Sequence, residues 1–451
     1  MNTTLWQNIL NFDLEGPVSE YGFSTRLSHE QNWTKAFTQK AILEYKKFMY
    51  LAGTSATMVS PSEIVDQVWH QHLIFSESYS RLCSIIGKFI QHIPSTHNKD
   101  ESEKFLLASQ RTRNLYTQVF GELPDEIWAY NNMLSSLQMK QAKVELIPLI
   151  ARTIFVSPLI LLLFYYLLRP LYVNIGNPDF VMTLLLLFVV SLALLDVYNT
   201  SYLIKLTGSW NNVFVLNNLL PIELTYLKSQ KREEVIHVLV NRLVEKGHIN
   251  VTPYPQKLEF DNDRGTHSPE EFTILQTLKE YGTISYEKLL PMLISKPTFT
   301  TTYRTMDTLK DHLINSKVFG KLFYLNFGWL LFLLNLGIVR VITGTQREKP
   351  VDIICFVVVV MVIVSVIFLR RLTHQVAVGP ILKLYQAKVA TNEIEHDRWD
   401  WRYYFLGTTA LSMYFIPVVE NLNSRDGSGG DGGSSSGGSS CSSCGGCGGG
   451  D

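Results

Sequence analysis

The sequence predicts a mainly α-helical membrane protein in which four transmembrane helices accompany a helical N-terminal domain and a small α+β module. Three features predict this: long apolar runs, apolar residues at helical spacing between them, and a Gly/Ser-rich end. Lysine plus arginine and aspartate plus glutamate number 40 each, so no net charge attracts nucleic acid. Hydrophobic residues make up 46% of the 451 residues, an ordinary average that hides how strongly they are concentrated.

Four segments are long enough to span a bilayer, since about 20 apolar residues cross about 30 Å of hydrocarbon. They are Ile147–Leu168, Phe180–Tyr198, Leu322–Thr343 and Val351–Leu369. The connections within each pair are short, so the sequence predicts two transmembrane hairpins, 147–198 and 322–369. Each hairpin returns the chain to the side that it left. The segments 1–140, 212–318 and 370–424 are therefore expected on one membrane face.

Basic residues gather at the span ends that face these three segments. They are Lys140, Lys143, Arg152, Lys205, Lys317, Lys321, Arg370 and Arg371. The short turns carry fewer: Arg169, Arg347 and Lys349, with Arg340 just inside the third span. Lysine and arginine are enriched on the cytoplasmic side, so we expect a multi-pass protein of the cell (inner) membrane with its domains and both termini in the cytoplasm. The start of the chain does not resemble a cleavable signal peptide.

Two opposite charges, Arg152 and Asp196, lie at similar depth within the first hairpin. They could form an ion pair, or each could extend separately to the headgroups. Neither interpretation indicates a transport pathway, because the spans carry no series of charged residues.

Amphipathic helices are expected through most of the N-terminal domain. One ends at Gly53, and the next begins at Ser60-Pro61-Ser62-Glu63, which combines a Ser cap, a proline at the first helical position and a glutamate at the third. A further helix is expected from about Ser76 to His92.

Histidine and cysteine side chains on these two helices form a candidate metal site. The predicted ligands are His72, Cys83 and His92, with His70 or Asp66 supplying another, a nitrogen and sulfur set that suits zinc. His70 and His72 point to opposite sides of a helix, so they cannot both bind one ion unless the helix breaks. The alternative is a packed hairpin in which hydrogen bonds satisfy the histidines and the cysteine acts as a small apolar residue.

The same region resembles the N-terminal domain of the glycine-rich-domain-protein-like family. The resemblance is carried by a Val-Asp-x-x-Trp-His-x-His-Leu pattern followed by Tyr, Cys and His-x-Pro. The matching residues are Val65, Asp66, Trp69, His70, His72, Leu73, Tyr79, Cys83, His92 and Pro94. It covers about a quarter of the chain and implies no biochemical activity.

The middle region is predicted to hold two helices, two short strands around Pro253 to Gln256, and a helix that begins at the capping box Ser268-Pro269-Glu270-Glu271. Two helices followed by a β-hairpin indicate a winged-helix-like module. Its basic residues are matched by glutamates, whereas a DNA-reading helix needs a basic footprint. We therefore expect a protein-contact or structural role and do not expect nucleic-acid binding.

This module also resembles a group of uncharacterised bacterial membrane proteins with Gly/Cys-rich tails. The shared pattern is Leu-x-Pro-x-Glu-x-x-Tyr-Leu after two spans. It is formed here by Leu219, Pro221, Glu223, Tyr226 and Leu227. Ser229-Gln230 stands where that group has a Gly-Gly pair.

The C-terminal end falls into two parts. Residues 370–424 are expected to form a helical region that packs on the other domains or lies at the membrane interface, rather than a fifth span. Residues 425–451 are rich in Gly and Ser and are expected to be disordered. The spacing of Cys441, Cys444 and Cys447 could hold a metal, but exposed thiols are the favoured interpretation.

No enzyme motif is present in the sequence: it has no Gly-rich phosphate loop, H-E-x-x-H or G-x-S-x-G. The leading hypothesis is a non-enzymatic membrane scaffold or sensor with cytoplasmic domains. The alternative is a metal-dependent enzyme that uses His70, His72, Cys83 and His92.

Overall fold

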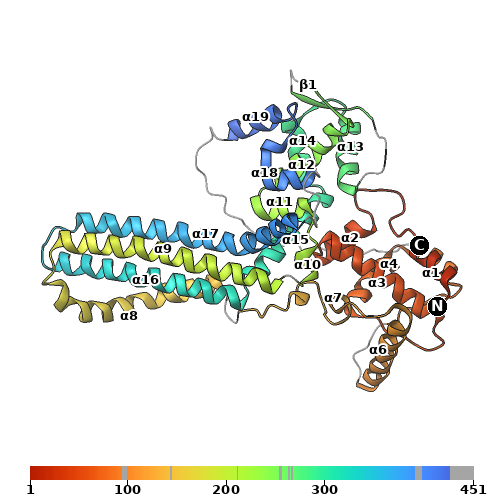
Figure 1. The fold of residues 1–451 in the computed structure, drawn as a ribbon, viewed down its shortest axis with the longest axis horizontal. Coiled ribbons are helices and arrows are strands. Elements are labelled where there is room, and N and C mark those ends of the chain that lie inside the picture. The colour runs from red at the N-terminus through yellow and green to blue at the C-terminus, as the bar shows by residue number, and fades with distance from the viewer. Residues whose placement is uncertain are drawn as a thin grey trace, which may run out of the picture.

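The chain forms a bundle of long helices with two helical lobes at one end (Figure 1). The structure is a computed structural model that describes residues 1–93, 99–142, 145–210, 212–252, 256–262, 265, 268–391 and 399–426. It is mainly helical, as the sequence predicts. The N-terminal lobe is red to orange in the figure, and the second lobe combines green and blue segments that lie far apart in the sequence.

The N-terminal lobe is entirely helical within its described residues. Its elements are α1 (Thr3–Leu10), α2 (Phe23–Gln31), α3 (Lys35–Thr54), α4 (Glu63–Ile74), α5 (Ser76–Ile86), α6 (Lys99–Phe120), α7 (Asp125–Trp128) and the 3-10 turn η1 (Ser135–Leu137). The buried Glu44 of α3 ties them together, since its carboxylate accepts hydrogen bonds from the Tyr116 hydroxyl at 2.7 Å and the Trp128 indole at 2.8 Å. Lys47 forms an ion pair with the other oxygen at 2.8 Å. A buried carboxylate is stable here because both of its oxygens have donors.

The start of α4 differs from the prediction. The helix begins at Glu63, and the capping side chain is Ser62, whose hydroxyl accepts from the Val65 amide at 3.3 Å. Ser60 is held outside the helix because its amide and carbonyl both bond to the Thr112 hydroxyl at 2.9 Å. A tertiary contact with α6 therefore overrides the local capping signal.

Among the described residues, four helices are long and apolar enough to cross a membrane, as predicted. They are α8 (Leu146–Tyr172), α9 (Asn177–Trp210), α16 (Lys317–Gln346) and α17 (Asp352–Ala390). They lie roughly parallel, with α8 at the edge (Figure 1). The main packing of α8 is against α16 rather than against α9, and α9 packs on α17. Most of α8 is exposed, as expected for a helix whose outer face meets lipid.

Polar contacts inside the bundle join the two hairpins. Asn199 and Asn326 are buried and exchange two amide hydrogen bonds, at 2.9 and 2.8 Å. At the far end, the Arg340 guanidinium donates to the carbonyl of Ile175 at 2.7 Å and to the side chain of Asn177 at 2.8 Å. Polar groups in an apolar environment need such partners.

Asp196 and Arg152 do not form the ion pair considered above. Asp196 instead lies 3.7 Å from Arg371 of α17, and Arg152 is exposed. The cause is the packing order, since α9 lies against α17 while α8 lies against α16.

The second lobe combines helices with a three-stranded antiparallel sheet at its outer edge (Figure 1). Its elements are α10 (Phe214–Asn217), α11 (Pro221–Ser229), α12 (Arg232–Glu245), β1 (Ile249–Thr252), β2 (Lys257–Phe260), α13 (Pro269–Tyr281), β3 (Ile284–Ser285), α14 (Tyr286–Ile294) and α15 (Pro297–Ile314). The sheet order is β1-β2-β3, with Ile249 opposite Phe260 and Leu258 opposite Ile284. The hairpin and the capping box at Ser268 are confirmed. The short strand β3 was not predicted, because two residues carry no period.

The C-terminal helices complete the second lobe. They are α18 (Trp399–Leu406), the 3-10 turn η2 (Gly407–Ala410) and α19 (Ile416–Asp426). Helix α18 packs on α11 and α12, and the fully buried ring of Phe415 lies 5.1 Å from that of Tyr286. This agrees with the expectation of a helical region packed on the other domains. Residues 427–451, which include Cys441, Cys444 and Cys447, lie outside the described residues.

A buried histidine should make the second lobe acid-labile. His237 of α12 is bonded to the Tyr286 hydroxyl at 2.7 Å, and burial, aided by Lys231, lowers its pKa from 6.5 to about 4. Above pH 6.5 the imidazole is neutral whether folded or unfolded. As the pH falls from 6.5 to 4, only the unfolded chain takes up the proton, so up to about 3 kcal/mol of stability is lost. Urea unfolding of the detergent-solubilised protein between pH 7.5 and 4.5 should show this slope, and His237→Gln should flatten it. Equal slopes for both proteins would contradict the prediction.

Candidate metal centre

Helix α4 presents its two histidines to different environments. His70 is exposed, whereas His72 is completely buried. Positions two apart on a helix differ by about 200°, so this separation follows from helical geometry alone.

His72 is part of the core of the N-terminal lobe. Its Nδ1 is 2.8 Å from the Tyr45 hydroxyl and its Nε2 is 3.1 Å from the Ser78 hydroxyl. Burial lowers its pKa to about 4, so the ring is neutral at physiological pH. Because both ring nitrogens already have partners, His72 is a structural histidine here. Cys83 is likewise buried in the core, and its sulfur is not among the ligand atoms that converge.

His92 reaches α4 because the chain turns back after α5. The helix ends at Ile86, and Gly87 adopts the left-handed conformation at φ +77°, which suits glycine. The prediction that this helix continues to His92 was therefore wrong. The returning segment is anchored by Tyr79, whose hydroxyl donates to the carbonyl of Ile90 and accepts from the Trp69 indole at 3.2 Å. The ring of His92 then packs edge-on against Trp69, 4.6 Å between centroids.

Three ligand atoms converge at the surface of the N-terminal lobe. The Nε2 atoms of His70 and His92 are 3.0 Å apart. The Asp66 carboxylate lies 3.0 Å from His92 Nε2 and 3.4 Å from His70 Nε2. Asp66 and His70 are four residues apart on one face of α4, and His92 comes from the returning segment. The structure therefore brings together three of the five candidate ligands, Asp66, His70 and His92, and leaves His72 and Cys83 outside the cluster.

The spacing of these atoms suits a small divalent cation. Nitrogen and oxygen ligands at about 2.1 Å from a tetrahedral ion stand about 3.4 Å from one another. The side chain of His70 is 59% exposed, that of Asp66 34% and that of His92 15%, so an ion held here keeps positions open to water. Two histidines and one carboxylate are a set used by zinc and by non-haem iron. Without a metal, the same atoms can share a proton in a hydrogen-bonded chain.

Comparisons with known proteins assign no function to this site. No protein-family model matches the chain, and neither a curated protein nor a solved structure matches it significantly.

A single bound divalent ion is the testable consequence of this cluster. A Cys441→Ser/Cys444→Ser/Cys447→Ser chain should bind one Co²⁺ or Zn²⁺, because the triad remains while the tail thiolates are gone. Adding His70→Ala and His92→Ala should weaken binding by more than about 100-fold, since two of three ligands are lost. Titration calorimetry and the Co²⁺ absorption spectrum measure both. His374→Ala, at an exposed histidine outside the cluster, is the matched control. No binding by the parent, or equal binding by all variants, would refute the site.

Proposed function

We propose that this chain is a multi-pass protein of the cell (inner) membrane that acts as a non-enzymatic scaffold or sensor, with its domains and both termini in the cytoplasm. The observation that carries the proposal is a buried polar junction between the N-terminal lobe and the second lobe. It joins regions more than 180 residues apart in the sequence into one body next to the bundle.

Lys35, at the start of α3, lies at the centre of the junction. Its ammonium contacts both carboxylate oxygens of Glu270 at 2.8 Å, and its backbone amide donates to Glu223 at 3.0 Å. The other oxygen of Glu223 accepts from the Leu220 amide at 2.7 Å. Glu223 and Glu270 are buried and lie in the first turns of α11 and α13, where the helix dipole favours a negative charge.

The two carboxyl groups differ in how well they are compensated. Burial by itself would raise the pKa of Glu270, but the ammonium and hydrogen bonds of Lys35 outweigh it, and the pKa is lowered. For Glu223 burial outweighs its hydrogen bonds and the attraction of Lys35, so its pKa is raised. The charge of Lys35 is thus directed mainly at Glu270.

Further contacts support a single cytoplasmic body. Lys296 of α15 forms an ion pair with Glu20 at 3.0 Å, and Arg304 donates to His29 at 2.9 Å. The long helix α17 runs from the membrane span into the second lobe, where the Tyr385 hydroxyl accepts from the Leu219 amide at 2.6 Å. A displacement of the span in α17 would therefore move the start of α11 directly.

The finer assignments rest on the sequence together with this arrangement. The excess of lysine and arginine at the lobe-bearing end of the bundle supports a cytoplasmic orientation. A helix followed by a hairpin, then two helices around a short third strand, supports a winged-helix-like module with a protein-contact role. The two family resemblances support a bacterial membrane protein with a Gly/Cys-rich tail.

The second candidate function is a metal-dependent enzyme. Its support is the Asp66, His70 and His92 cluster, whose open positions would let an ion polarise a substrate or activate water. The cluster lies on an exposed surface, and the large pocket between the bundle and the N-terminal lobe contains none of its residues.

Separating the lobes should have a measurable cost. Lys35→Met removes the partner of a buried carboxylate, and because Lys35 is about a third exposed we expect a loss of about 1–3 kcal/mol. Hydrogen exchange should rise at the starts of α3, α11 and α13 together. Arg26→Met, which removes the exposed pair with Glu30, is the control and should cost under about 0.5 kcal/mol. Equal effects of the two changes would show that the junction does not join the lobes.

The proposed role is tested in cells by topology and by partner capture. Single cysteines in residues 1–140, 212–262 and 399–424 should resist an impermeant thiol reagent, and cysteines in the turns 173–176 and 347–351 should react. Proximity labelling should return a common set of neighbours that Lys35→Met reduces and His70→Ala/His92→Ala leaves unchanged. Labelling of the first region from outside would overturn the topology. Loss of the neighbours on removing the histidines would favour the metal-dependent enzyme.

A further inference from the structure

A pocket of about 1240 Å³ lies where the bundle meets the N-terminal lobe. Known small-molecule sites occupy roughly 300–1,000 Å³, so this space exceeds what a typical metabolite fills. One wall comes from the lobe-bearing ends of the bundle helices, with Leu206 and Trp210 on α9 and Phe319 on α16. The opposite wall comes from α7 and the segment after it, which includes Tyr130 and Gln138. The pocket therefore lies at the level where a span leaves the bilayer.

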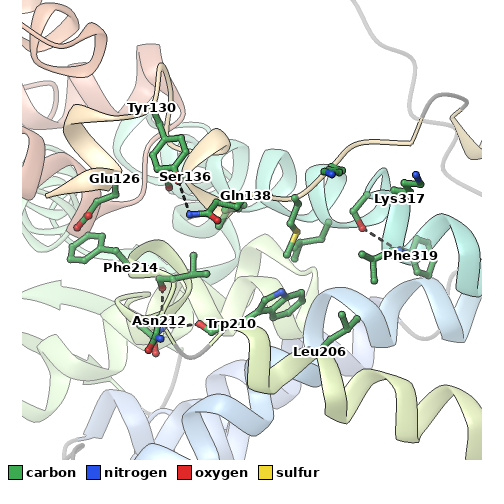
Figure 2. A pocket seen from close by; sticks show the side chains of 18 of the residues that line it. Glu126, Tyr130, Ser136, Gln138, Leu206, Trp210, Asn212, Phe214, Lys317 and Phe319 are labelled. Atoms are coloured by element: carbon green, nitrogen blue, oxygen red, sulfur yellow. Dashed lines mark hydrogen bonds between the residues drawn. The ribbon is translucent and has the colours of Figure 1, made fainter.

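The two ends of the pocket have opposite character. Figure 2 shows Lys317 and Phe319 at one end, and Glu126, Tyr130 and Phe214 at the other. Glu126 is neutralised by an ion pair with Lys40. The exposed carboxylates Glu122 and Asp125 also line the pocket.

Three lysines, Lys140, Lys317 and Lys321, line the pocket together. The Lys317 amide donates to the carbonyl of Lys140 at 2.7 Å, which holds these two residues side by side. Lys321 lies four residues after Lys317, so both project from one face of α16. All three are exposed, and no carboxylate forms an ion pair with them in the described part of the chain. Like charges on neighbouring side chains repel one another, and a phosphate bound between these lysines would offset that repulsion.

An apolar surface continues from the lysines into the bundle. Phe319 and Val376 are nearly fully buried and belong to a cluster at this end of the spans, against which Tyr202 and Leu206 also pack. Trp210 and Tyr202 have the amphipathic rings that favour the membrane–water boundary. A ligand that has both a phosphate and an apolar chain can contact the lysines and the apolar surface beside them, whereas inorganic phosphate can contact only the lysines.

We propose that this pocket binds the headgroup of an anionic glycerophospholipid. The phosphate lies between Lys140, Lys317 and Lys321, away from Glu122 and Asp125. The acyl chains pass the partly exposed side chains of Tyr202 and Leu206 into the bilayer. Basic pockets between transmembrane helices are a known mode of binding such headgroups. The inference rests on the proposed insertion of the bundle in a membrane.

The experiment uses the full chain, delipidated in mild detergent and offered vesicles of phosphatidylglycerol or phosphatidylcholine. Native mass spectrometry counts the lipid retained. The wild type should prefer phosphatidylglycerol, and Lys140→Gln/Lys317→Gln/Lys321→Gln should lower that preference by about 10- to 100-fold. The matched control, Lys205→Gln/Lys383→Gln/Arg370→Gln, removes the same charge at the lobe-bearing end but outside the pocket, and should keep the preference.

Each other outcome overturns the proposal. An equal loss in both triple variants would assign the effect to general surface charge. Displacement of the lipid by millimolar inorganic phosphate would make the pocket a free-phosphate site. Extraction of the wild-type chain from membranes by carbonate would instead refute membrane insertion, and so distinguishes failure of the proposed function from failure of the lipid site.

Discussion

The buried junction at Lys35 is the constraint on which the arrangement of the domains depends. Carboxylates are costly to bury, and Glu223 and Glu270 are stable because each lies at a helix start and meets a donor from α3. The junction also fixes an orientation, because Lys35 donates from its ammonium to Glu270 and from its backbone amide to Glu223. These contacts fix the start of α3 against α11 and α13.

The same principle explains how the bundle of long apolar helices is attached to the lobes. Leu219 lies just before α11, and Pro221, Glu223, Tyr226 and Leu227 lie within it; the two polar side chains, Glu223 and Tyr226, bond to different elements. Glu223 binds α3, and the Tyr226 hydroxyl lies 3.0 Å from both oxygens of Asp307 on α15. The backbone of Leu219 meets Tyr385 on the extension of α17. Helix α11 is thus where the N-terminal lobe, the second lobe and the last span meet.

The sequence could predict those parts of the structure that depend on local pattern. Span length follows from hydrocarbon thickness, and the hairpin and the capping box at Ser268 follow from short-range chemistry. Packing order could not be predicted: α8 and α9 are joined by a short turn, yet α8 packs mainly on α16, which separates Arg152 from Asp196. The predicted cap was Ser60, but its contact with Thr112, more than 50 residues away, holds it outside the helix, and Ser62 is the cap instead.

In the candidate metal site, too, some features follow from local sequence pattern and others depend on tertiary packing. Asp66 and His70 could be paired from their spacing of four, and the opposite orientation of His72 was already implied by helical geometry. The arrival of His92 depends on Gly87 ending α5 and on Tyr79 holding the returning chain. The glycine was the available signal, since a left-handed helix end reverses the chain. Helix α7 packs against α4, which carries Asp66 and His70, and also lines the pocket through Asp125 and Glu126. Helix α7 therefore supports the helix that carries two of the three ligands and also forms part of the pocket wall, a double role that follows from its packing and not from its four-residue sequence.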